Sequence, residues 1–509
     1  MTNDTNHIAK KLELNYHKSM QGKFNIRTVL IVFLLSIVFI LNLTKISDPD
    51  FFWHLKTGEI IASSGAPSQD GFSWTHAGQK WLDHEWLSQL VFYTVFEHTG
   101  FAGLILLKAA VITGAFFMVF LVCLKTSSSR HPPRQTFSGG LPAFETSVFV
   151  TALGGALSSI TYSVRPQLFS FFLLAALLMI LYEKEKQSRL LRVIPFLFVL
   201  WINLHGMFVI GLSVLAVFAV EETLLKRKLS TLGIITLITA FALLINPYGF
   251  RAVIHPFKYL AGSTHLHMNY IMEWMSPDFH SVYGKGLLIY IFISLSSFIF
   301  SPEKPAARDI FLYLFFLAGA LYSVRNLPLF MIISSPAAAK HIALCLAPFL
   351  KRVSDKTSPA VIKSKALCAL NYLLIAAALL IIIMTFRKNF RDGYLQDNQL
   401  PRSSAKEIAA LNPVRLLHPY HWGGYLIYSG VKVFIDGRAD FYPGEFLEDF
   451  FQSTELMKDP GGFLEKNNFD LILWEKNAPL SFYLSNSEDW ELTRSDEISV
   501  IYKRKKQRS

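Results

Sequence analysis

Charged residues are scarce in this sequence of 509 residues, in which Asp, Glu, Lys and Arg make up 17% and hydrophobic residues 52%. So low a charged fraction argues against a set of soluble domains and favours a membrane protein. Cysteine is also rare. The three cysteines, Cys123, Cys345 and Cys368, lie in or beside apolar segments, so neither a disulfide framework nor redox chemistry is expected.

Several motifs of soluble enzymes are absent as well. The sequence has no glycine-rich nucleotide-binding loop between a strand and a helix, no P-loop and no G-x-S-x-G nucleophile elbow. The net charge of +12 could indicate a nucleic-acid partner. However, the Lys and Arg residues lie mostly in short loops between apolar segments, so they indicate membrane topology and no binding of nucleic acid.

Long apolar segments dominate what is present. Polar residues divide them into about eleven candidate spans, several of them shorter than the roughly 20 residues that cross a bilayer as a helix. The first follows a basic N-terminal region, residues 1–27, and no small-residue cleavage pattern occurs before Asp48, so we expect it to be retained. The predicted spans are 28–46, 101–124, 146–163, 167–182, 190–204, 207–221, 230–245, 286–300, 309–323, 327–348 and 366–386.

The loops between these segments alternate in charge. With a cytoplasmic N-terminus, every second span ends in a loop rich in Lys and Arg, as the positive-inside rule requires. An odd number of spans then places the C-terminal region, 387–509, on the outer face with the loops 47–100 and 246–285. We therefore predict a polytopic α-helical protein of the bacterial inner membrane, with a transmembrane domain over 28–386.

The C-terminal region differs in composition from the rest. It is polar, with short alternating runs and turn signals that predict a small extracytoplasmic α/β domain. The predicted strands are Val431–Ile435, Leu471–Trp474, Trp490–Arg494 and Ser499–Lys503, the last two forming a hairpin, and the predicted helices are Ser404–Leu411 and Gly444–Gln452.

The loop 47–100 holds the densest group of polar motifs. Asp48, Pro49 and Asp50 suit the start of a helix, where acidic residues complement the helix dipole. Capping does not account for His54, which lies four residues after Asp50 and thus on the same helix face. This pair could bind a divalent cation or accept a proton. Glu85 is either a second active carboxylate or the first-turn acid of a short interfacial helix over 85–98.

Further polar residues recur at the outer ends of the predicted spans. Each outer arginine could simply anchor its helix at the interface, but several such residues on one membrane face also suit a phosphate group. Trp422 and Arg438 lie in the outer domain, where Arg438 either pairs with Asp440 or contacts substrate. The pair His265 and His267 is a weak metal signal. The residues at the span ends are Arg165, His205, Glu273 and Arg325.

The string Asp48-Pro49-Asp50-Phe51-Phe52-Trp53-His54-Leu55 resembles the first-loop acidic motif of the GT-C class of membrane glycosyltransferases. This class includes the catalytic subunits of oligosaccharyltransferases and the protein O-mannosyltransferases. Trp422-Gly423-Gly424-Tyr425 is more faintly similar to the Trp-Trp-Asp-Tyr-Gly segment of the oligosaccharyltransferases. The many spans and the outer α/β domain fit the same class, and the whole chain also resembles a group of bacterial membrane proteins of unsettled activity.

The resemblance implies transfer of a sugar from a polyprenyl-phosphate donor to a glycan, lipid or protein acceptor at the outer face of the membrane. It implies that Asp50, with Asp48, coordinates Mg²⁺ or Mn²⁺ or orients the acceptor, and that Arg165 or Arg325 neutralises the departing lipid phosphate. The spacing from Asp50 makes His54 a candidate for a further metal ligand. Gly423 stands where the oligosaccharyltransferases have Asp, which argues against recognition of a peptide sequon. We expect Asp48, Asp50 and Glu85 to be catalytic, and His54, Arg165, His205, Glu273, Arg325, Trp422 and Arg438 to bind substrate.

Two other functions fit a multi-pass protein with an outer domain. A transporter or flippase of lipid-linked glycans would carry charged groups near the midplane of its spans and a repeated pair of broken helices. The sequence shows its polar residues mainly at the outer span ends and no internal repeat, which favours an enzyme. In a non-catalytic envelope assembly protein, the loop carboxylates would not face a shared cavity.

Overall fold

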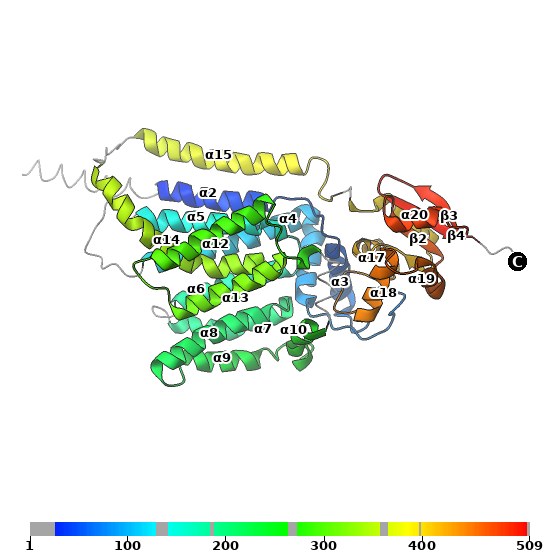
Figure 1. Ribbon diagram of the computed structural model, residues 1–509, viewed down its shortest axis with the longest axis horizontal. Coiled ribbons are helices and arrows are strands. Elements are labelled where there is room, and N and C mark those ends of the chain that lie inside the picture. Colours follow the sequence, from blue (N-terminus) through cyan, green and yellow to red (C-terminus); the bar gives the residue numbers. More distant parts are fainter. Residues whose placement is uncertain are drawn as a thin grey trace, which may run out of the picture.

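The structure is a computed structural model that describes residues 26–128, 141–183, 188–262, 272–356, 365–396 and 399–505. Its long helices run side by side, and the C-terminal elements lie together at one end of them (Figure 1). The N-terminal region up to residue 25 and the pair His265 and His267 fall outside the described residues.

Each of the eleven predicted apolar segments corresponds to a helix. Among the described residues, six helices are long and apolar enough to cross a membrane, and three shorter apolar ones are Ile26–Leu41, Gln167–Glu183 and Thr231–Ala242. The number of crossings stays a prediction. The helices are α2 (Ile26–Leu41), α4 (Trp86–Ser128), α5 (Leu141–Ser158), α6 (Gln167–Glu183), α7 (Ile194–Leu204), α8 (Phe208–Lys226), α9 (Thr231–Ala242), α12 (Val282–Phe300), α13 (Ala307–Tyr322), α14 (Leu327–Lys356) and α15 (Lys365–Asn389).

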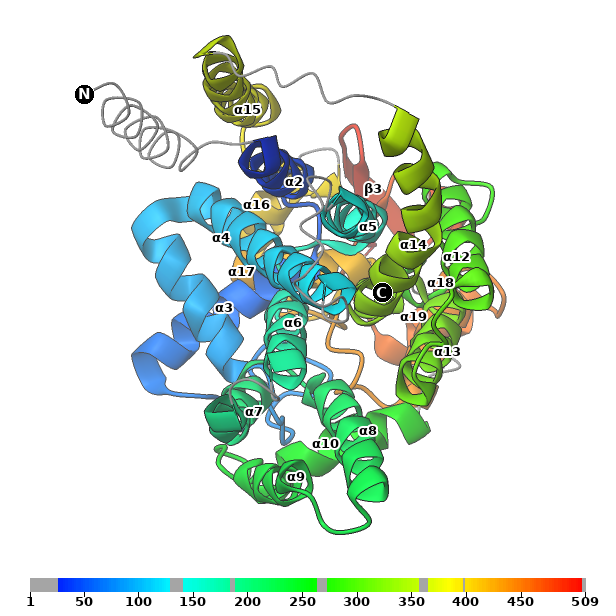
Figure 2. The ribbon, with the colours of Figure 1, turned by 90° about the vertical axis from the view of Figure 1, so that its left-hand side faces the viewer.

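These helices carry apolar residues on their exposed sides as well as in the core. α15 lies at the edge of the bundle beside α2 (Figure 2), and its leucine and isoleucine side chains, such as Leu373 and Ile381, are exposed. A helix that is apolar all round is expected where lipid covers the outer face. The chain is therefore a multi-pass membrane protein.

The loop between α2 and the membrane-crossing part of α4 contains a helix of its own, α3 (Asp50–Ser64). It packs on the first turns of α4, where a side chain on Gly58 would collide with the Gln89 carbonyl oxygen at 2.2 Å. α4 is broken at Gly100, whose φ of 62° lies in the left-handed region that favours glycine. The break separates a short helix from the predicted span over 101–124; the location of the short helix at the membrane interface stays a prediction.

The C-terminal domain is built on a four-stranded sheet in the order β1-β2-β4-β3. β1 (Leu416–Leu417) runs parallel to β2 (Leu471–Glu475). β4 (Ser499–Arg504) pairs antiparallel with β2 on one side and with β3 (Trp490–Ser495), its hairpin partner, on the other. The predictions for β2, β3 and β4 are confirmed. The domain's helices are α16 (Arg402–Leu411), α17 (Gly423–Tyr428), α18 (Gly444–Thr454), α19 (Pro460–Asn467) and α20 (Pro479–Ser485).

The predicted strand Val431–Ile435 is wrong. Val433 forms only an isolated bridge with Ser73 of the first loop, because this apolar run is used to attach that loop to the domain rather than to extend the sheet. The backbone N–H of Trp74 donates to Val433 O at 2.9 Å, and that of Val433 donates to Phe72 O at 3.1 Å.

A buried ionic network also stabilises the contact between the first loop and the C-terminal domain. The guanidinium of Arg438 donates to Asp436 Oδ2 and to Asp70 Oδ1, each at 2.7 Å, and only 1% of Arg438 is exposed. Its guanidinium also lies 4.7 Å from the ring centre of Trp81. The first loop and the C-terminal domain thus form one body at the same end of the helices, which supports their predicted location on one side of the membrane.

Candidate active site

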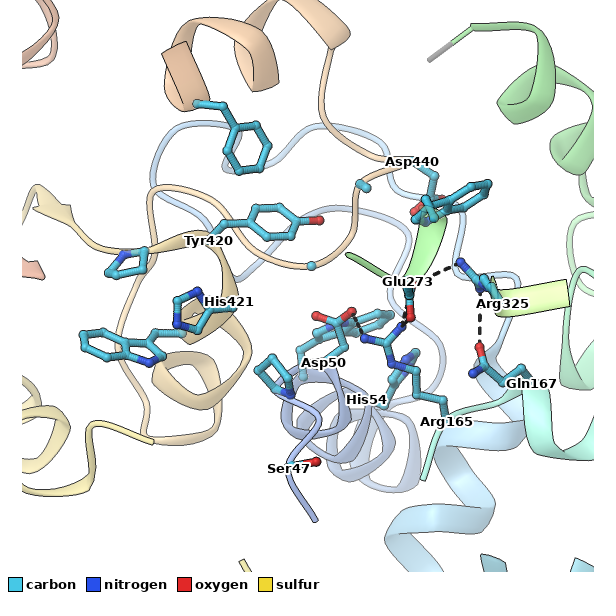
Figure 3. A pocket seen from close by; sticks show the side chains of 18 of the residues that line it. Ser47, Asp50, His54, Arg165, Gln167, Glu273, Arg325, Tyr420, His421 and Asp440 are labelled. Atoms are coloured by element: carbon cyan, nitrogen blue, oxygen red, sulfur yellow. Dashed lines mark hydrogen bonds and ion pairs between the residues drawn. The ribbon is translucent and has the colours of Figure 1, made fainter. Parts of the chain in front are cut away.

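A cavity of about 1270 Å³ lies where the helix ends, the first loop and the C-terminal domain meet. Its lining includes eight residues that the sequence analysis selected, although they are far apart in the chain. Figure 3 shows the groups on its floor, with Tyr420 and His421 of the C-terminal domain on the facing wall. The eight residues are Asp50, His54, Glu85, Arg165, His205, Glu273, Arg325 and Trp422.

Arg165 is at the centre of the floor, in the turn between α5 and α6. Its Nη1 donates to both Glu273 carboxylate oxygens at 3.0 Å, and its Nη2 donates to Asp48 Oδ1 and Asp50 Oδ2 at 2.7 Å each. Its Nε also pairs with Asp48. Although burial disfavours a charged group, the Asp48, Glu273 and Asp50 carboxylates hold the pKa of Arg165 well above its ordinary value. The guanidinium is thus fully engaged by protein carboxylates.

Arg325, which follows α13 in the short helix η4 (Val324–Asn326), is held more loosely. Its Nη1 lies 3.3 Å from Glu273 Oε1 and its Nη2 lies 3.4 Å from Gln167 Oε1, both near the upper limit for hydrogen bonds. Its buried Nε has no hydrogen-bond partner among the described residues. Because both contacts are long, the terminal nitrogens of Arg325 can turn to an anion in the cavity.

Asp50 begins α3, and its backbone N–H donates to Asp48 Oδ1 at 3.0 Å. This bond and the Arg165 contacts give Asp48 a positioning role, and Asp48 is not part of the cavity lining. Burial raises the pKa of Asp50 to about 7, an effect that Arg165 opposes and the Asp48 and Glu273 carboxylates strengthen. Burial also favours the neutral form of Glu273, but Arg165 and Arg325 hold the pKa of Glu273 below its ordinary value.

Glu85 is surrounded by three imidazoles. Its carboxylate oxygens lie 3.2 Å from His205 Nε2, 3.7 Å from His84 Nε2 and 3.8 Å from His54 Nδ1. The Nδ1 atom of His205 is 2.8 Å from Ser170 Oγ, which fixes its ring. Burial raises the pKa of Glu85 well above its ordinary value and lowers the pKa values of His54 and His205 well below theirs. This cluster is thus favoured in its uncharged state.

The proposed metal ligands Asp50 and His54 do not form a cation site. The Asp50 carboxylate is bonded to the Arg165 guanidinium, and His54 Nδ1 faces Gln89 Nε2 at 3.4 Å and Glu85. A positive guanidinium next to the carboxylate does not fit a divalent cation at the same oxygens.

Arg438 is not part of the cavity lining, in contrast to the prediction that it binds substrate. It does not pair with Asp440 either, because its guanidinium is engaged by Asp436 and Asp70. Trp422 does line the cavity, but its indole N–H donates to the Gln399 carbonyl oxygen at 3.1 Å. Asp440 pairs with His255 Nε2 at 3.0 Å. His255 was not predicted from the sequence, because no motif surrounds it.

The lining of the cavity is mixed in chemistry. The N-terminal ends of α8 and α14 contribute apolar residues, Met207, Val209, Ile210 and Leu329. The C-terminal domain contributes polar residues, His421, Glu475, Lys476 and Asn477. The cavity therefore suits ligands that have both apolar and hydrophilic parts.

No protein-family model matches the sequence, and no curated protein matches it significantly. Solved structures do have a similar arrangement. ArnT from Cupriavidus metallidurans bound to undecaprenyl phosphate is 14% identical, with a TM-score of 0.44, over 93% of this chain and 97% of ArnT. The apo state of the same protein gives 15% identity and a TM-score of 0.47 over the same shares.

The archaeal oligosaccharyltransferase AglB from Archaeoglobus fulgidus, in complex with an inhibitory peptide and a dolichol-phosphate, is 11% identical. Its TM-score is 0.46, over 88% of this chain and 69% of AglB. At this level of similarity, none of these structures assigns an activity to this chain.

Proposed function

We propose that this protein is a membrane glycosyltransferase that moves a sugar from a polyprenyl-phosphate donor to an acceptor hydroxyl at the outer face of the cytoplasmic membrane. The observation that carries the proposal is the grouping of Asp50, Arg165, Glu273 and Arg325 on the floor of one cavity. These residues come from four separate segments, and a purely structural role does not require all of them to face a cavity of this size.

The donor side is the side of Arg325. A lipid phosphate has an anionic head and an apolar chain, and the same cavity contains a weakly held guanidinium and apolar residues at the ends of two helices. Guanidinium groups bind phosphate oxygens in pairs. Arg165 is a poorer candidate for this role, since three carboxylates already neutralise it.

The base is Asp50. With a pKa of about 7, its carboxylate can take a proton near neutral pH and is a stronger base than an ordinary aspartate. Arg165 holds Oδ2 of this carboxyl group at 2.7 Å, which fixes its position. Asp48 and Glu273 act by positioning Arg165.

In the proposed reaction the acceptor oxygen attacks the anomeric carbon of the donor sugar while Asp50 accepts the hydroxyl proton. The bond between the anomeric carbon and the phosphate oxygen breaks, and the electron pair leaves with the polyprenyl phosphate. Arg325 stabilises the charge that develops on the leaving phosphate, and electrostatic stabilisation of this kind is the main source of rate enhancement in many enzymes. The acceptor proton stays on Asp50, and no nucleotide is needed.

The acceptor is a glycan or lipid hydroxyl rather than a peptide sequon. A Cβ on Gly423 would meet the carbonyl oxygen of Ile435 at 2.4 Å and the Asp436 Cα at 2.8 Å. The position that corresponds to Asp in the oligosaccharyltransferase segment therefore has no room for a carboxylate side chain.

The experiment is a transfer assay with the purified full-length protein and a panel of polyprenyl-phosphate monosaccharides, in which release of lipid phosphate is measured. Asp50→Asn should lower the rate by about 100- to 10,000-fold, the usual contribution of general base catalysis. Asp392→Asn is a matched control, because Asp392 is exposed after α15 and does not line the cavity. Equal rates in the two variants would refute the assignment of Asp50.

A further inference from the structure

A second group of side chains lies in the wall of the cavity and takes no part in the proposed reaction. His84, His255 and Asp440 each offer one ligand atom, and the three atoms lie within 4.8 Å of one another. The distance from His255 Nε2 to Asp440 Oδ2 is 3.0 Å, and that from His84 Nδ1 to the same oxygen is 4.0 Å. The two imidazole rings are 4.6 Å apart, centre to centre.

The spacing of the three atoms is compatible with a metal site, and the contact of His255 with Asp440 is also short enough for a hydrogen bond. With zinc–ligand bonds of about 2.0–2.1 Å in a tetrahedral arrangement, ligand atoms lie about 3.3 Å apart. The observed 3.0 and 4.0 Å bracket this value, so small rotations of the side chains would bring all three atoms to one ion. Among the described residues, this is the one group of three or more such ligands.

The three residues come from segments that only the tertiary structure brings together. His84 lies in the first loop, His255 in α10 (Phe250–Gly262), and Asp440 in the C-terminal domain before α18. Each side chain is about one-fifth exposed and lines the cavity, so the group is accessible to an ion from solvent and still mostly enclosed.

A second observation concerns the ring of His84. Its Nδ1 faces Asp440, whereas its Nε2 lies 3.7 Å from Glu85 Oε1. Metal-binding histidines usually direct their second ring nitrogen at a carboxylate or carbonyl, which fixes the ring and its tautomer. Glu85 is in turn 3.2 Å from His205 Nε2. Glu85, which is not one of the three potential ligands, thus offers a carboxyl group to the ring nitrogen of His84 that faces away from Asp440.

Another His–carboxylate pair in the same cavity provides a comparison. His421 Nε2 lies 3.1 Å from Glu475 Oε1, as close as His255 is to Asp440, but no third ligand of the described chain completes that group. A simple ion pair accounts for His421 and Glu475, whereas His84 adds a third potential ligand beside the pair of His255 and Asp440.

We propose that His84, His255 and Asp440 bind one Zn²⁺ ion, with a fourth ligand supplied from the cavity. Two imidazoles and one carboxylate are typical of zinc and related transition metals, while Mg²⁺ and Ca²⁺ prefer oxygen ligands. The ion fastens the first loop and α10 to the C-terminal domain around the cavity. The site is distinct from Asp50 and does not depend on the proposed glycosyl transfer.

The test measures metal content rather than activity. The purified full-length protein is stripped with a chelator, dialysed against Zn²⁺, Mn²⁺ or Mg²⁺ in separate samples, and analysed by mass spectrometry of the metal. We expect one equivalent of zinc and no retained magnesium. His255→Ala and Asp440→Asn should each lose the zinc, and Glu85→Gln should weaken binding by about 10- to 100-fold, as loss of a supporting carboxylate does.

His421→Ala is the matched control and should keep its zinc. If His255→Ala does not fold, Asp440→Asn gives the same information with little change in volume. The chelator should lower the melting temperature of the parent protein but not that of either ligand variant, because only a bound ion stabilises the folded state. A parent protein that binds no zinc, or a His421→Ala variant that loses as much zinc as His255→Ala, would overturn the proposal.

Discussion

Gly437 of the C-terminal domain lies directly against the carboxylate of Asp50 in α3, so that a Cβ on Gly437 would be 1.6 Å from Asp50 Oδ1. Gly424 makes a similar approach, since its Cβ would meet the Pro49 carbonyl oxygen at 2.3 Å. Two glycines thus allow the domain to close over the start of α3. The position of the proposed base depends on a domain that begins more than three hundred residues later.

This contact predicts the effect of Gly437→Ala. The added methyl group must displace the Asp50 carboxylate, and a shift of about 1 Å in a reacting group costs on the order of 100-fold in rate. Gly71→Ala is the matched control, because a Cβ there meets nothing within 4 Å. Transfer rates and melting temperatures of both variants check the prediction, which is wrong if the two alanine variants are equally active.

The two arginines of the cavity floor should respond differently to mutation. Arg165→Ala leaves three carboxylates without their partner and should destabilise the protein by about 3–5 kcal/mol, as loss of a buried ionic partner does. Arg325→Ala should leave stability almost unchanged but weaken binding of a long-chain polyprenyl phosphate by about 10- to 100-fold, the value of a hydrogen bond to a charged group.

Thermal unfolding and lipid-phosphate titration separate these two effects. Arg251→Ala, at an exposed position in α10, controls for loss of a positive charge on the same end of the molecule. The assignment of roles would have to be reversed if Arg165→Ala bound lipid phosphate poorly at full stability.

Asp50 gives the reaction a dependence on pH. Because burial raises its pKa to about 7, the base is protonated below this value, and kcat/KM should fall about tenfold for each pH unit below it. Above pH 7 the rate should reach a plateau. The stability of the folded protein changes with pH in the opposite direction to the rate. Protonation of Asp50 stabilises the folded state, and this stabilisation is complete below the ordinary pKa of 3.8 and is lost as the pH rises through about 7.

A pH profile of transfer, with melting temperatures at each pH, tests both statements. Asp50→Asn should lack the rising limb in its residual activity, and its melting temperature relative to the parent protein should improve as the pH rises from 6 to 8. A parent profile that stays flat through neutral pH would exclude Asp50 as the base.

The first loop and the C-terminal domain should both face away from the cytoplasm. In a cysteine-free background, Ser485→Cys in the domain should react with a membrane-impermeant thiol reagent in intact spheroplasts. Lys304→Cys, an exposed position between α12 and α13, should react only after permeabilisation. The reverse pattern would invert the topology and leave the site without access to an outer-face acceptor.

Much of this arrangement follows from local sequence. The apolar segments predicted every long helix, because the length of an apolar run is set by the bilayer. Arg165, Glu273 and Arg325 could be assigned to one face, since charged loops alternate across the membrane. Their grouping with Asp50 around a single cavity then required only that the helices pack side by side.

Contacts between distant segments could not be predicted in this way. Arg438 was expected to pair with Asp440 or to bind substrate, whereas it pairs with Asp70, which lies 368 residues away. His255 was not selected at all, because its partners His84 and Asp440 come from other segments. Val431–Ile435 has the composition of a strand, but it binds a loop instead of a sheet. In each case the partner, not the residue itself, determines the role.

The most direct measurement is an experimental structure of the full-length protein with a long-chain polyprenyl phosphate, determined by electron cryomicroscopy. The account predicts phosphate density within hydrogen-bonding distance of the Arg325 guanidinium, the lipid chain along the ends of α8 and α14, and Asp50 facing the same space. Phosphate density elsewhere, with Arg325 still bonded only to Glu273 and Gln167, would contradict it.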